Sequence, residues 1–300
     1  MLQHQVTQTP ESCGQTGSRW SLKKIRNVCR WLKDHGDSTA WRVLKRCKVA
    51  FKRGRDHVHS PDLAYLEKLA AIVTALRAAA ESHGEIVLVF ADEYTLWRPP
   101  EVASDYAVVG ATSQPWAQRS HRANTSWRYR GYLNALTGQV TYLDAKQIGL
   151  KQLVDGHAAL RAAYPQARLI YVVEDNWPVH YHPEVLAALQ PQTTPFPLKT
   201  PPNWPTEPSA KARRLDLPIQ LLPLPTYASW CNPIEKLWRW LKQELLHLHR
   251  YADDWTKLKQ ETNDFLTRFD TASADLLRYV GLTENSELYG AVLATHETKT

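Results

Sequence analysis

The sequence predicts an α/β protein in which a mixed sheet flanked by helices follows a small helical domain. Three observations predict this fold class. Two continuous apolar runs, 86–91 and 169–173, are typical of strands that are buried on both faces. Segments with helical periodicity, such as 150–164, alternate with these strands along the chain. A basic segment with helical periodicity precedes all of them.

Composition excludes several classes of protein. The 300 residues are 43% apolar and 22% charged, as in an ordinary globular protein. The apolar runs are too short to span a bilayer, and the polar start lacks the apolar stretch of a signal peptide. Four scattered cysteines form no Cys-x-x-Cys pair, which argues against structural zinc and a disulfide frame. The sequence therefore predicts a cytoplasmic protein that does not bind a membrane.

Charge is concentrated near the start of the chain. Between Arg19 and His57 there are thirteen Lys or Arg against three acids, a net charge of +10. Since the whole chain carries +7, the remainder nets −3. A basic segment before a mildly acidic body is typical of a protein that binds nucleic acid, although a solvated charged surface would give the same count.

The basic segment predicts a DNA-binding domain at 19–60, after a polar, disordered tail at 1–18. Helical spacing predicts a first helix that ends at Gly36 and a second that begins at Ser38, followed by a brief strand at 49–51. This layout is typical of a helix-turn-helix module, and a small structural helical hairpin would look similar. The candidate DNA-contacting residues are Arg42, Lys45 and Arg46 on the second helix, with Lys52, Arg53 and Arg55 after it.

The body is expected to begin with a linker helix at 61–84, opened by Ser60-Pro61-Asp62. The core at 85–250 then contains the two buried strands, a hairpin around Thr137-Gly138, a short helix at 181–189 and a last strand at 219–222. Seven prolines in 190–208 predict an irregular loop that extends to about 212. A strongly amphipathic helix begins at Asn232-Pro233, and a helical tail occupies 251–300.

Two acids follow the two buried strands. Asp92 comes directly after the first strand, and Asp175 follows the second with one residue between. If the strands are neighbours with level ends, both carboxylates emerge at the same edge of the sheet, where sites of open α/β sheets lie. Carboxylates that close repel one another unless a cation neutralises them, and Mg²⁺ prefers such oxygen ligands.

Three motifs carry a resemblance to a known family. The stretch LPTYASWCNPIEKLWRWLK, which ends at Lys242, resembles the signature around the last acid of DDE transposases. The segment FADE, with Asp92 and Glu93, is similar to the family's first motif. The segment EDNWPVH, from Glu174 to His180 and with Asp175 as its acid, is similar to the second. The branch that the chain most resembles is the bacterial insertion-sequence-630 type, related to mariner. The resemblance covers about 20–285.

The resemblance implies a ribonuclease H-like core in which Asp92, Asp175 and Glu235 bind two Mg²⁺ or Mn²⁺ ions. It implies cut-and-paste transposition: cleavage of double-stranded DNA at the element's ends and strand transfer into a target. It also implies a homodimer on DNA and a prokaryotic, nucleoid-associated location.

Neighbouring residues are expected to support the site. For Glu235 a structural alternative exists, because Asn232 and Glu235 have the spacing of a capping box at the start of a helix. Glu93 is expected to point away from Asp92, since successive strand residues face opposite sides. Asn176, His180 and Asn232 are expected to orient the site from behind the ligands.

The sequence departs from the family in two places. Asp175 and Glu235 are sixty positions apart, which predicts an inserted loop at the proline-rich stretch and makes a dimer contact there one interpretation. Only one helix-turn-helix can be recognised in the sequence, whereas relatives commonly carry two. A second interpretation is therefore that the chain is a truncated copy. Two alternatives stay open: a ribonuclease H-like nuclease without strand transfer, and a transposase-derived DNA-binding protein whose acids are unused.

Overall fold

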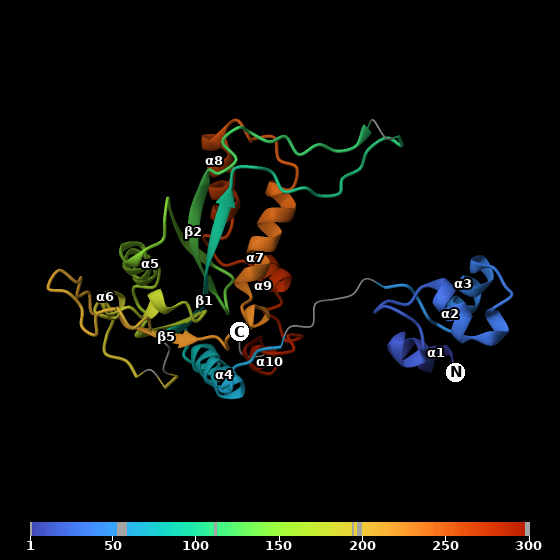
Figure 1. Ribbon diagram of the computed structural model, residues 1–300. Helices are drawn as coiled ribbons and strands as arrows, with labels where there is room; N and C mark the ends of the chain where they lie inside the picture. Colours follow the sequence, from blue (N-terminus) through green and yellow to red (C-terminus); the bar gives the residue numbers. More distant parts are fainter. Residues whose placement is uncertain (1, 53–58, 111–112, 194, 197–199, 298–300) are drawn as a thin grey trace. The chain divides into compact units, whose positions relative to one another are not determined.

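The structure, a computed structural model, describes residues 2–52, 59–110, 113–193, 195–196 and 200–297. The chain divides into two compact units, Met1–Val58 and His59–Thr300 (Figure 1). Within the described ranges, no helix is long and apolar enough to cross a membrane.

The first unit is a small helical domain. Its helices are α1 (Leu2–Thr7), α2 (Leu22–Val28) and α3 (Asp37–Arg46), with 3₁₀ turns at Glu11–Cys13 and Arg30–Leu32. The N-terminal helical region predicted from the sequence is therefore present. Its core is formed by the buried side chains Ile25, Cys29, Leu32 and Leu44, with Val6, Trp20, Leu22, Val43 and Val49 packed against them.

Three details of this unit differ from the sequence prediction. Helix α1 lies in the predicted tail at 1–18, because Val6 packs on the core and Trp20 Nε1 donates a hydrogen bond to the Gln8 carbonyl at 2.9 Å. Helix α3 begins at Asp37 after Gly36 without a side-chain cap, so Ser38 is not the capping residue. No strand forms at 49–51, since the described part of this unit offers no strand for it to pair with.

The second unit is built on one mixed five-stranded sheet. Its strands are β1 (Ile86–Trp97), β2 (Ser126–Asn134), β3 (Val140–Ala145), β4 (Leu169–Glu174) and β5 (Ile219–Pro223). Their order is β3-β2-β1-β4-β5. The pairs β1–β2 and β2–β3 are antiparallel, whereas β1–β4 and β4–β5 are parallel. The fold-class prediction of a mixed sheet is confirmed.

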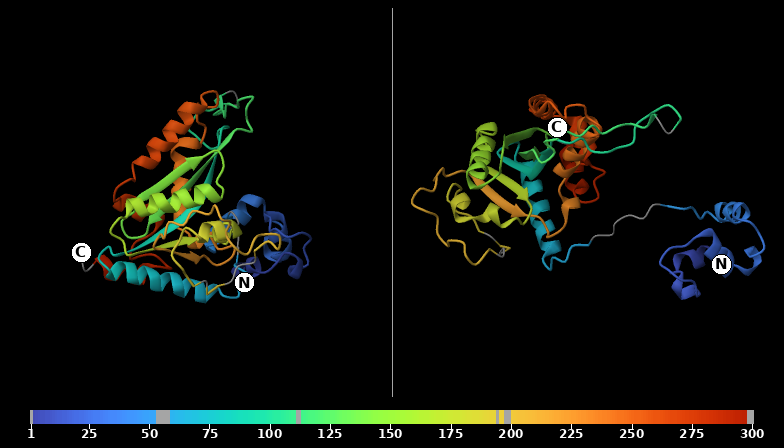
Figure 2. Two further views of the ribbon diagram at one scale, coloured as in Figure 1. Left: turned by 90° about the vertical axis from the view of Figure 1, so that its left-hand side faces the viewer. Right: turned by 45° about the horizontal axis from the view of Figure 1, so that its top comes forward.

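Helices cover both faces of the sheet, with α5 on one face and α7 on the other (Figures 1 and 2). Apolar residues of α4 and of α7 to α10 pack on one face, while those of α5 and α6 pack on the opposite face. The helices are α4 (Tyr65–Glu81), α5 (Leu150–Ala163), α6 (Pro183–Leu186), α7 (Ile234–Leu241), α8 (Trp255–Thr267), α9 (Ala274–Val280) and α10 (Gly290–Glu297). Short 3₁₀ turns lie at Pro178–Tyr181 and Ser229–Cys231, and a π-helical turn at Lys242–Leu246 continues α7.

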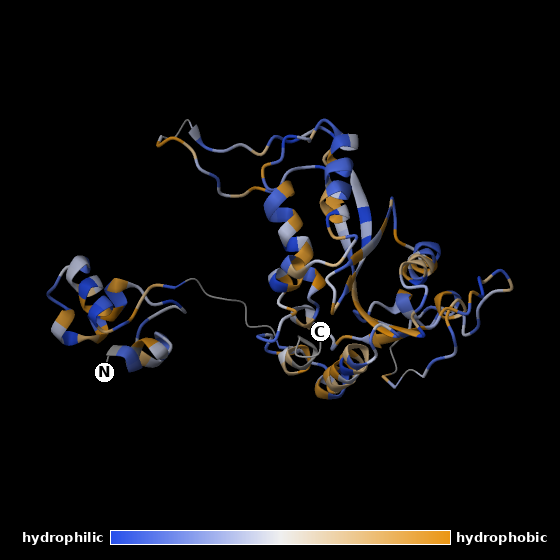
Figure 3. Ribbon diagram, turned by 180° about the vertical axis from the view of Figure 1, so that it is seen from behind, coloured by the Kyte–Doolittle hydropathy of each residue, from blue (hydrophilic) through white to orange (hydrophobic). Residues whose placement is uncertain are grey.

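Burial follows the hydrophobic pattern of each element, and Figure 3 shows apolar and polar residues alternating along the helices.

The α4 helix was predicted as a linker between domains. Its residues Ile72 and Leu76 are instead fully buried in the sheet's core, so α4 is an integral part of the second unit. The proline-rich stretch contains no helix or strand in its described residues, because proline cannot donate the backbone hydrogen bonds of either.

Candidate active site

The two parallel strands β1 and β4 place Asp92 and Asp175 at the same level. Their backbone pairing ends at Phe90 and Val173, so Asp92 is two residues beyond the last pair, and so is Asp175. The prediction that Asp92 follows the end of its strand needs correction. Strand β1 continues to Trp97 because β2 pairs with it on the other side as far as Ser126. Asp92 therefore lies in a strand whose parallel neighbour has just ended.

Strand alternation decides which face Asp92 points to. Phe90 and Tyr94, which share the parity of Asp92, belong to the core that includes α7. Opposite Asp92 on β2 stands Gly131, where an added Cβ would lie 2.8 Å from the Trp238 ring of α7. Glycine at this position lets the helix approach the strand closely. As a result, Trp238 Nε1 donates a hydrogen bond to Asp92 Oδ2 at 2.9 Å.

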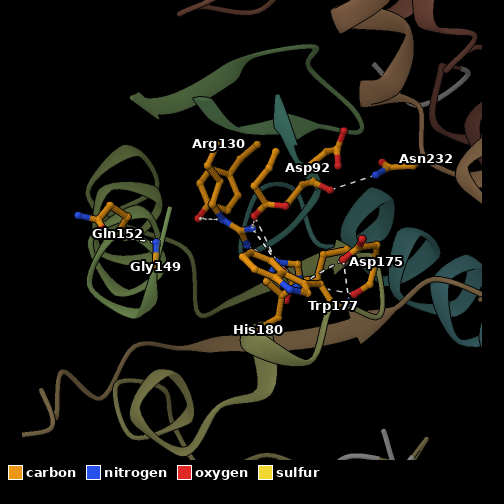
Figure 4. Close-up of polar contacts among 12 residues, drawn as sticks. Asp92, Arg130, Gly149, Gln152, Asp175, Trp177, His180 and Asn232 are labelled. Carbon is orange, nitrogen blue, oxygen red and sulfur yellow. Dashed lines mark hydrogen bonds and ion pairs between the residues drawn. The ribbon is translucent and has the colours of Figure 1, made fainter. Parts of the chain in front are cut away.

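The start of α7 is tied to β1 beside Asp92. The buried side chain of Asn232 donates from Nδ2 to the carbonyl oxygen of Ala91 at 3.0 Å, a contact drawn as a dashed line in Figure 4. Asn232 does not cap the helix, because Pro233 is the residue before α7 and no side chain caps it. The capping-box alternative for Glu235 therefore does not hold in this structure. Glu235 is the second residue of α7, and it is exposed.

The negative charges of neighbouring acids add to the pKa shifts of Asp92 and Glu235. Burial raises the pKa of the Asp92 carboxyl well above its usual range, and the negative charges of Glu235 and Glu93 add to this effect. Asp175 acts on the Asp92 pKa in the same direction. Although Glu235 is exposed, partial desolvation by the surrounding protein also raises its pKa, while the charge of Arg239 opposes the shift and that of Asp175 adds to it. A cation bound between these carboxylates would stabilise their ionised forms.

The donor chemistry of this set fits a hard divalent cation, although the side chains are not arranged as ligands. Among the described residues, no group of three or more His, Cys, Asp or Glu side chains is placed to hold a metal ion. Three carboxylates are nevertheless the oxygen ligands that Mg²⁺ and Mn²⁺ accept. Asp175 and Glu235 are exposed, and exposed side chains change rotamer readily. The hydrogen bond from Trp238 is made to Oδ2 of Asp92 and does not involve Oδ1.

Behind this set, on the opposite face of the sheet, lies a buried polar network around Arg130 of β2 (Figure 4). Its guanidinium donates to carboxylate oxygens of both Glu93 on β1 and Glu174 on β4. Arg130 Nε donates to the hydroxyl of Tyr132 at 2.7 Å, and Arg130 Nη1 lies 3.2 Å from Nε2 of His180. Glu93 thus points away from Asp92, which agrees with strand alternation.

Charges within the network reinforce one another. Burial would raise the pKa of Glu93, but the charge of Arg130 and a hydrogen bond with His180 outweigh it and lower this pKa to about 2. Burial would lower the pKa of His180, but the charge of Glu174 and the bond with Glu93 raise it. His180 also reaches the proposed site, since its Nδ1 lies 3.4 Å from Asp175 Oδ1.

A second set of contacts fastens the segment that follows Asp175. Asn176 Nδ2 donates to the carbonyl oxygen of Leu224 at 2.6 Å. Its Oδ1 accepts from Nζ of Lys68 on α4 at 3.2 Å, and Lys68 also pairs with Asp62 at 2.8 Å. Asp62 in turn accepts from the backbone N–H of Thr226 at 2.8 Å. The Ser60-Pro61-Asp62 segment is therefore connected to the loop that leads to α7.

Sequence reasoning named some members of these contacts and missed others. It named Glu93, Asn176, His180 and Asn232 as supporting residues. It missed Arg130, although an arginine between Tyr129 and the Tyr132-Leu133 pair of an expected strand was a signal for it. It also missed the partners Trp238 and Lys68, which lie on helices whose packing the sequence does not specify.

The predicted DNA-contacting residues lie in the first unit. Arg42, Lys45 and Arg46 are exposed on α3, and Lys52 is exposed after it. Lys45 Nζ lies 5.3 Å from the ring centre of Trp41, which is itself 54% exposed. Two further candidates, Arg53 and Arg55, lie outside the described residues.

Comparisons with known proteins bear on the family and the fold. A family model described as "DDE superfamily endonuclease" matches residues 87–259, a span that contains all three acids. The "Insertion element IS630 uncharacterized 39 kDa protein" of Shigella sonnei is 22% identical over 264 residues, which cover 87% of this chain and 68% of that protein. The resemblance to bacterial insertion-sequence transposases related to mariner is thereby confirmed.

Solved structures share the fold. The pre-cleavage Mos1 transpososome has a TM-score of 0.59 at 13% identity, covering 98% of this chain and 77% of that chain. The mariner Mos1 paired-end complex with Mg has a TM-score of 0.57 at 15% identity, with the same coverage. The sheet and its flanking helices thus have the ribonuclease H-like fold. Because the family match spans more than half of its length, this chain belongs to the DDE superfamily endonuclease family.

Proposed function

We propose that this chain is a transposase that cleaves double-stranded DNA at the ends of its own element and joins those ends to a target DNA. The carrying observation is the position of Asp92, which lies where the β1–β4 pairing ends and where burial, together with the charges of Glu235 and Asp175, raises its pKa. The Mos1 structures with this fold are named as complexes with a transposon end, with Mn and with Mg. These names support DNA and a divalent metal as the chain's partners.

The carboxylates of Asp92, Asp175 and Glu235 are proposed to hold two Mg²⁺ or Mn²⁺ ions. When bound, a metal centre of this kind would supply activation of an attacking water or 3′-hydroxyl and stabilisation of the leaving oxygen in a phosphoryl transfer. The chain's own contribution is placement. Trp238 orients the Asp92 carboxylate through its hydrogen bond, and Asn232 fixes the start of α7 against β1.

The first unit is proposed to bind the element's ends. Its exposed Arg42, Lys45 and Arg46 on α3, together with Lys52, offer positive charge to phosphates and donors to base edges. Arg53 and Arg55 extend this basic segment in the sequence. A second copy of the chain is proposed as a further partner on DNA, since two ends have to be held for one joining event.

The acidic set is tested with purified protein, Mg²⁺ and a duplex that carries the element's own end and flanking DNA. The wild type is expected to cleave at the end and to form joined products with target DNA. Asp92→Asn and Asp175→Asn are expected to abolish both reactions, because an amide keeps the shape but removes the charge that holds the ions. Asp264→Asn, an exposed acid on α8, is the matched control and should keep wild-type rates.

Each alternative function has its own outcome in this assay. Cleavage without joined products would support a nuclease that lacks strand transfer. End-specific binding without any cleavage by the wild type would support a DNA-binding protein whose acids are unused. Full cleavage by either Asn variant would refute the two-metal proposal.

A further inference from the structure

Arg130 is the largest fully buried side chain in the described part of the chain, with none of its surface exposed. Removing a guanidinium from water costs several kcal/mol unless its charge and donors are satisfied by the protein. Here it is satisfied by two carboxylates, a tyrosine hydroxyl and a histidine ring, as described above. The fold therefore includes a costly group at a position where an apolar residue would pack, in a strand with apolar neighbours.

The contacts of Arg130 span three strands. Arg130 belongs to β2, and it reaches past the neighbouring β1, where it binds Glu93, to Glu174 on β4. Both acids follow the last backbone pair between β1 and β4, Phe90 with Val173. Beyond this level no ladder hydrogen bonds between the two strands set their separation. The guanidinium thus joins β1 and β4 at the height of the proposed site, and His180 supports it with contacts to Glu93 at 3.2 Å and to Glu174 at 3.5 Å.

The two acids that Arg130 holds are the chain neighbours of the two proposed metal ligands. Glu93 follows Asp92, and Glu174 precedes Asp175. Glu93 and Glu174 point to the face opposite α7, so fixing them fixes the backbone from which Asp92 and Asp175 project. Ions that must lie ~3.5–4 Å apart need their ligands placed to within a fraction of that distance.

We propose that Arg130 is a positioning residue that sets the spacing of Asp92 and Asp175, and through it the affinity of the site for divalent metal. The inference rests on the proposed function, because it takes these two aspartates as metal ligands. In this proposal Arg130 acts through its contacts with Glu93 and Glu174. A lysine cannot replace it, since an ammonium is a single point charge and lacks the fork that binds two carboxylates at once.

Electrostatics and positioning predict opposite signs for the loss of this residue. Arg130 is a cation close to the site, so its charge alone repels a metal ion, and removing the charge would strengthen metal binding. If Arg130 acts by positioning, removing it weakens metal binding. Two variants keep the net charge of the network and so isolate positioning: Arg130→Lys, and the double variant Arg130→Met with Glu174→Gln. The double variant removes the buried cation together with one of its two carboxylates, and Glu93 keeps its contact with His180, which limits the cost to folding.

The experiment measures Mn²⁺ binding by isothermal titration calorimetry and the thermal midpoint of the metal-free protein, both without DNA. Each charge-balanced variant is expected to bind Mn²⁺ at least ~10-fold more weakly than the wild type, the size typical of residues behind metal ligands. Arg98→Lys is the matched control. Arg98 is also buried, but it donates to the Ala252 carbonyl away from the acids, so this variant should lower the thermal midpoint and leave Mn²⁺ affinity unchanged.

Three outcomes separate this inference from the proposed function. Weakened Mn²⁺ binding in every charge-balanced variant that folds, with unchanged binding in Arg98→Lys, supports the positioning role. Wild-type affinity in a folded charge-balanced variant overturns it. If Asp92→Asn binds Mn²⁺ as the wild type does, the proposed metal site is wrong, and Arg130 then has no site to position.

Discussion

At the scale of single residues, the ion pair between Asp62 and Lys68 joins segments that are far apart in the sequence. Both side chains are buried, with 9% and 7% of their surface exposed. Burial would raise the pKa of Asp62, but hydrogen bonds from Lys68 and from the backbone of Thr226 outweigh it and lower this pKa to about 2. The ionised form of the Asp62 carboxylate is therefore more stable in the folded protein than in the unfolded chain.

The pH dependence of this contribution follows from the direction of the shift. The folded pKa of about 2 lies below the ordinary value of 3.8, so the stabilisation is present above about pH 5 and is lost as pH falls through 3.8 toward 2. We expect Asp62→Asn to lower the free energy of unfolding by about 2 kcal/mol at pH 7, and the difference from wild type to shrink toward pH 2. Urea unfolding at several pH values measures this difference.

The control for Asp62 is an acid in a surface pair. Asp275 contacts Arg278 with 81% of its side chain exposed, so Asp275→Asn should change stability by less than ~1 kcal/mol at any pH. A difference between wild type and Asp62→Asn that stays constant from pH 7 to pH 2.5 would show that the ionised carboxylate is not the stabilising form.

The sequence predicted the acids better than their surroundings. Asp92, Asp175 and Glu235 could be named because a motif marks each of them, and the two aspartates also follow apolar strand segments. Arg130 could not be given a role, because its partners depend on the strand order β2-β1-β4, which no local pattern encodes. The sequence likewise allowed two roles for Asn232, because it shows only the residues next to it. Whether its side chain caps α7 or binds Ala91 is decided by the approach of the helix to β1.

At the scale of elements, the sequence predicted the five strands and most helices but not all of their extents. The apolar run of β1 ended the prediction at Ala91, whereas the strand continues to Trp97 through polar residues. Hydrophobicity marks where a strand is buried, while its length is set by its partner, here β2. The same limit explains α4, whose amphipathic pattern predicted a helix without showing that it packs in the core.

The segment between β1 and β2 exposes apolar side chains that a lone chain would bury. It projects from the sheet as the long loop beside α8 in Figure 1. Tyr106 and Val109 are fully exposed, and Trp116 is 82% exposed. Exposed apolar groups of this kind mark interaction surfaces. By contrast, Trp204 in the proline-rich stretch packs on His182, so the apolar surface favours the β1–β2 segment over that stretch for the proposed contact with a second copy.

We expect the triple substitution Tyr106→Ser, Val109→Ser and Trp116→Ser to convert the DNA-bound dimer into a monomer, because it removes the apolar surface that a second copy would cover. Multi-angle light scattering of the protein with end DNA measures the stoichiometry. The matched control replaces Leu63 and Leu66, which are also exposed, at the start of α4. A triple variant that remains dimeric on DNA would place the interface elsewhere.

At the scale of the whole molecule, the residues proposed for DNA recognition and those proposed for chemistry lie in different units of the chain. The basic residues predicted to read DNA lie in Met1–Val58, and the acidic set lies in His59–Thr300. The net charge of the basic segment could be read from the sequence, and it is consistent with exposed cations on α3. The structure does not change the proposed division of labour, in which the first unit selects the DNA and the second cuts and joins it.

This division predicts two kinds of DNA-binding variant in the first unit. Arg46 is exposed on α3, which is the proposed recognition helix, whereas Lys52 follows the helix. Contacts with base edges specify sequence, and contacts with phosphates supply affinity for any duplex. Arg46→Ala should therefore reduce discrimination between end DNA and random DNA by ~1–3 kcal/mol if it contacts guanine. Arg42→Ala should have the same but a weaker effect. Arg42 follows Trp41 in the sequence, and a side chain on that side of the helix covers the domain core more than it faces DNA.

Lys52→Ala should instead weaken binding to both DNAs alike, with the slope of log affinity against log salt reduced by ~0.9 for the lost phosphate contact. Fluorescence anisotropy titrations of each variant on both DNAs, at several salt concentrations, separate the two effects. Lys257→Ala, which removes an exposed lysine paired with Glu261 on α8, serves as the control for a general loss of charge. If Arg46→Ala and Lys52→Ala change both DNAs equally and to the same degree as Lys257→Ala, α3 does not read the ends, and recognition has to lie outside the first unit's basic residues.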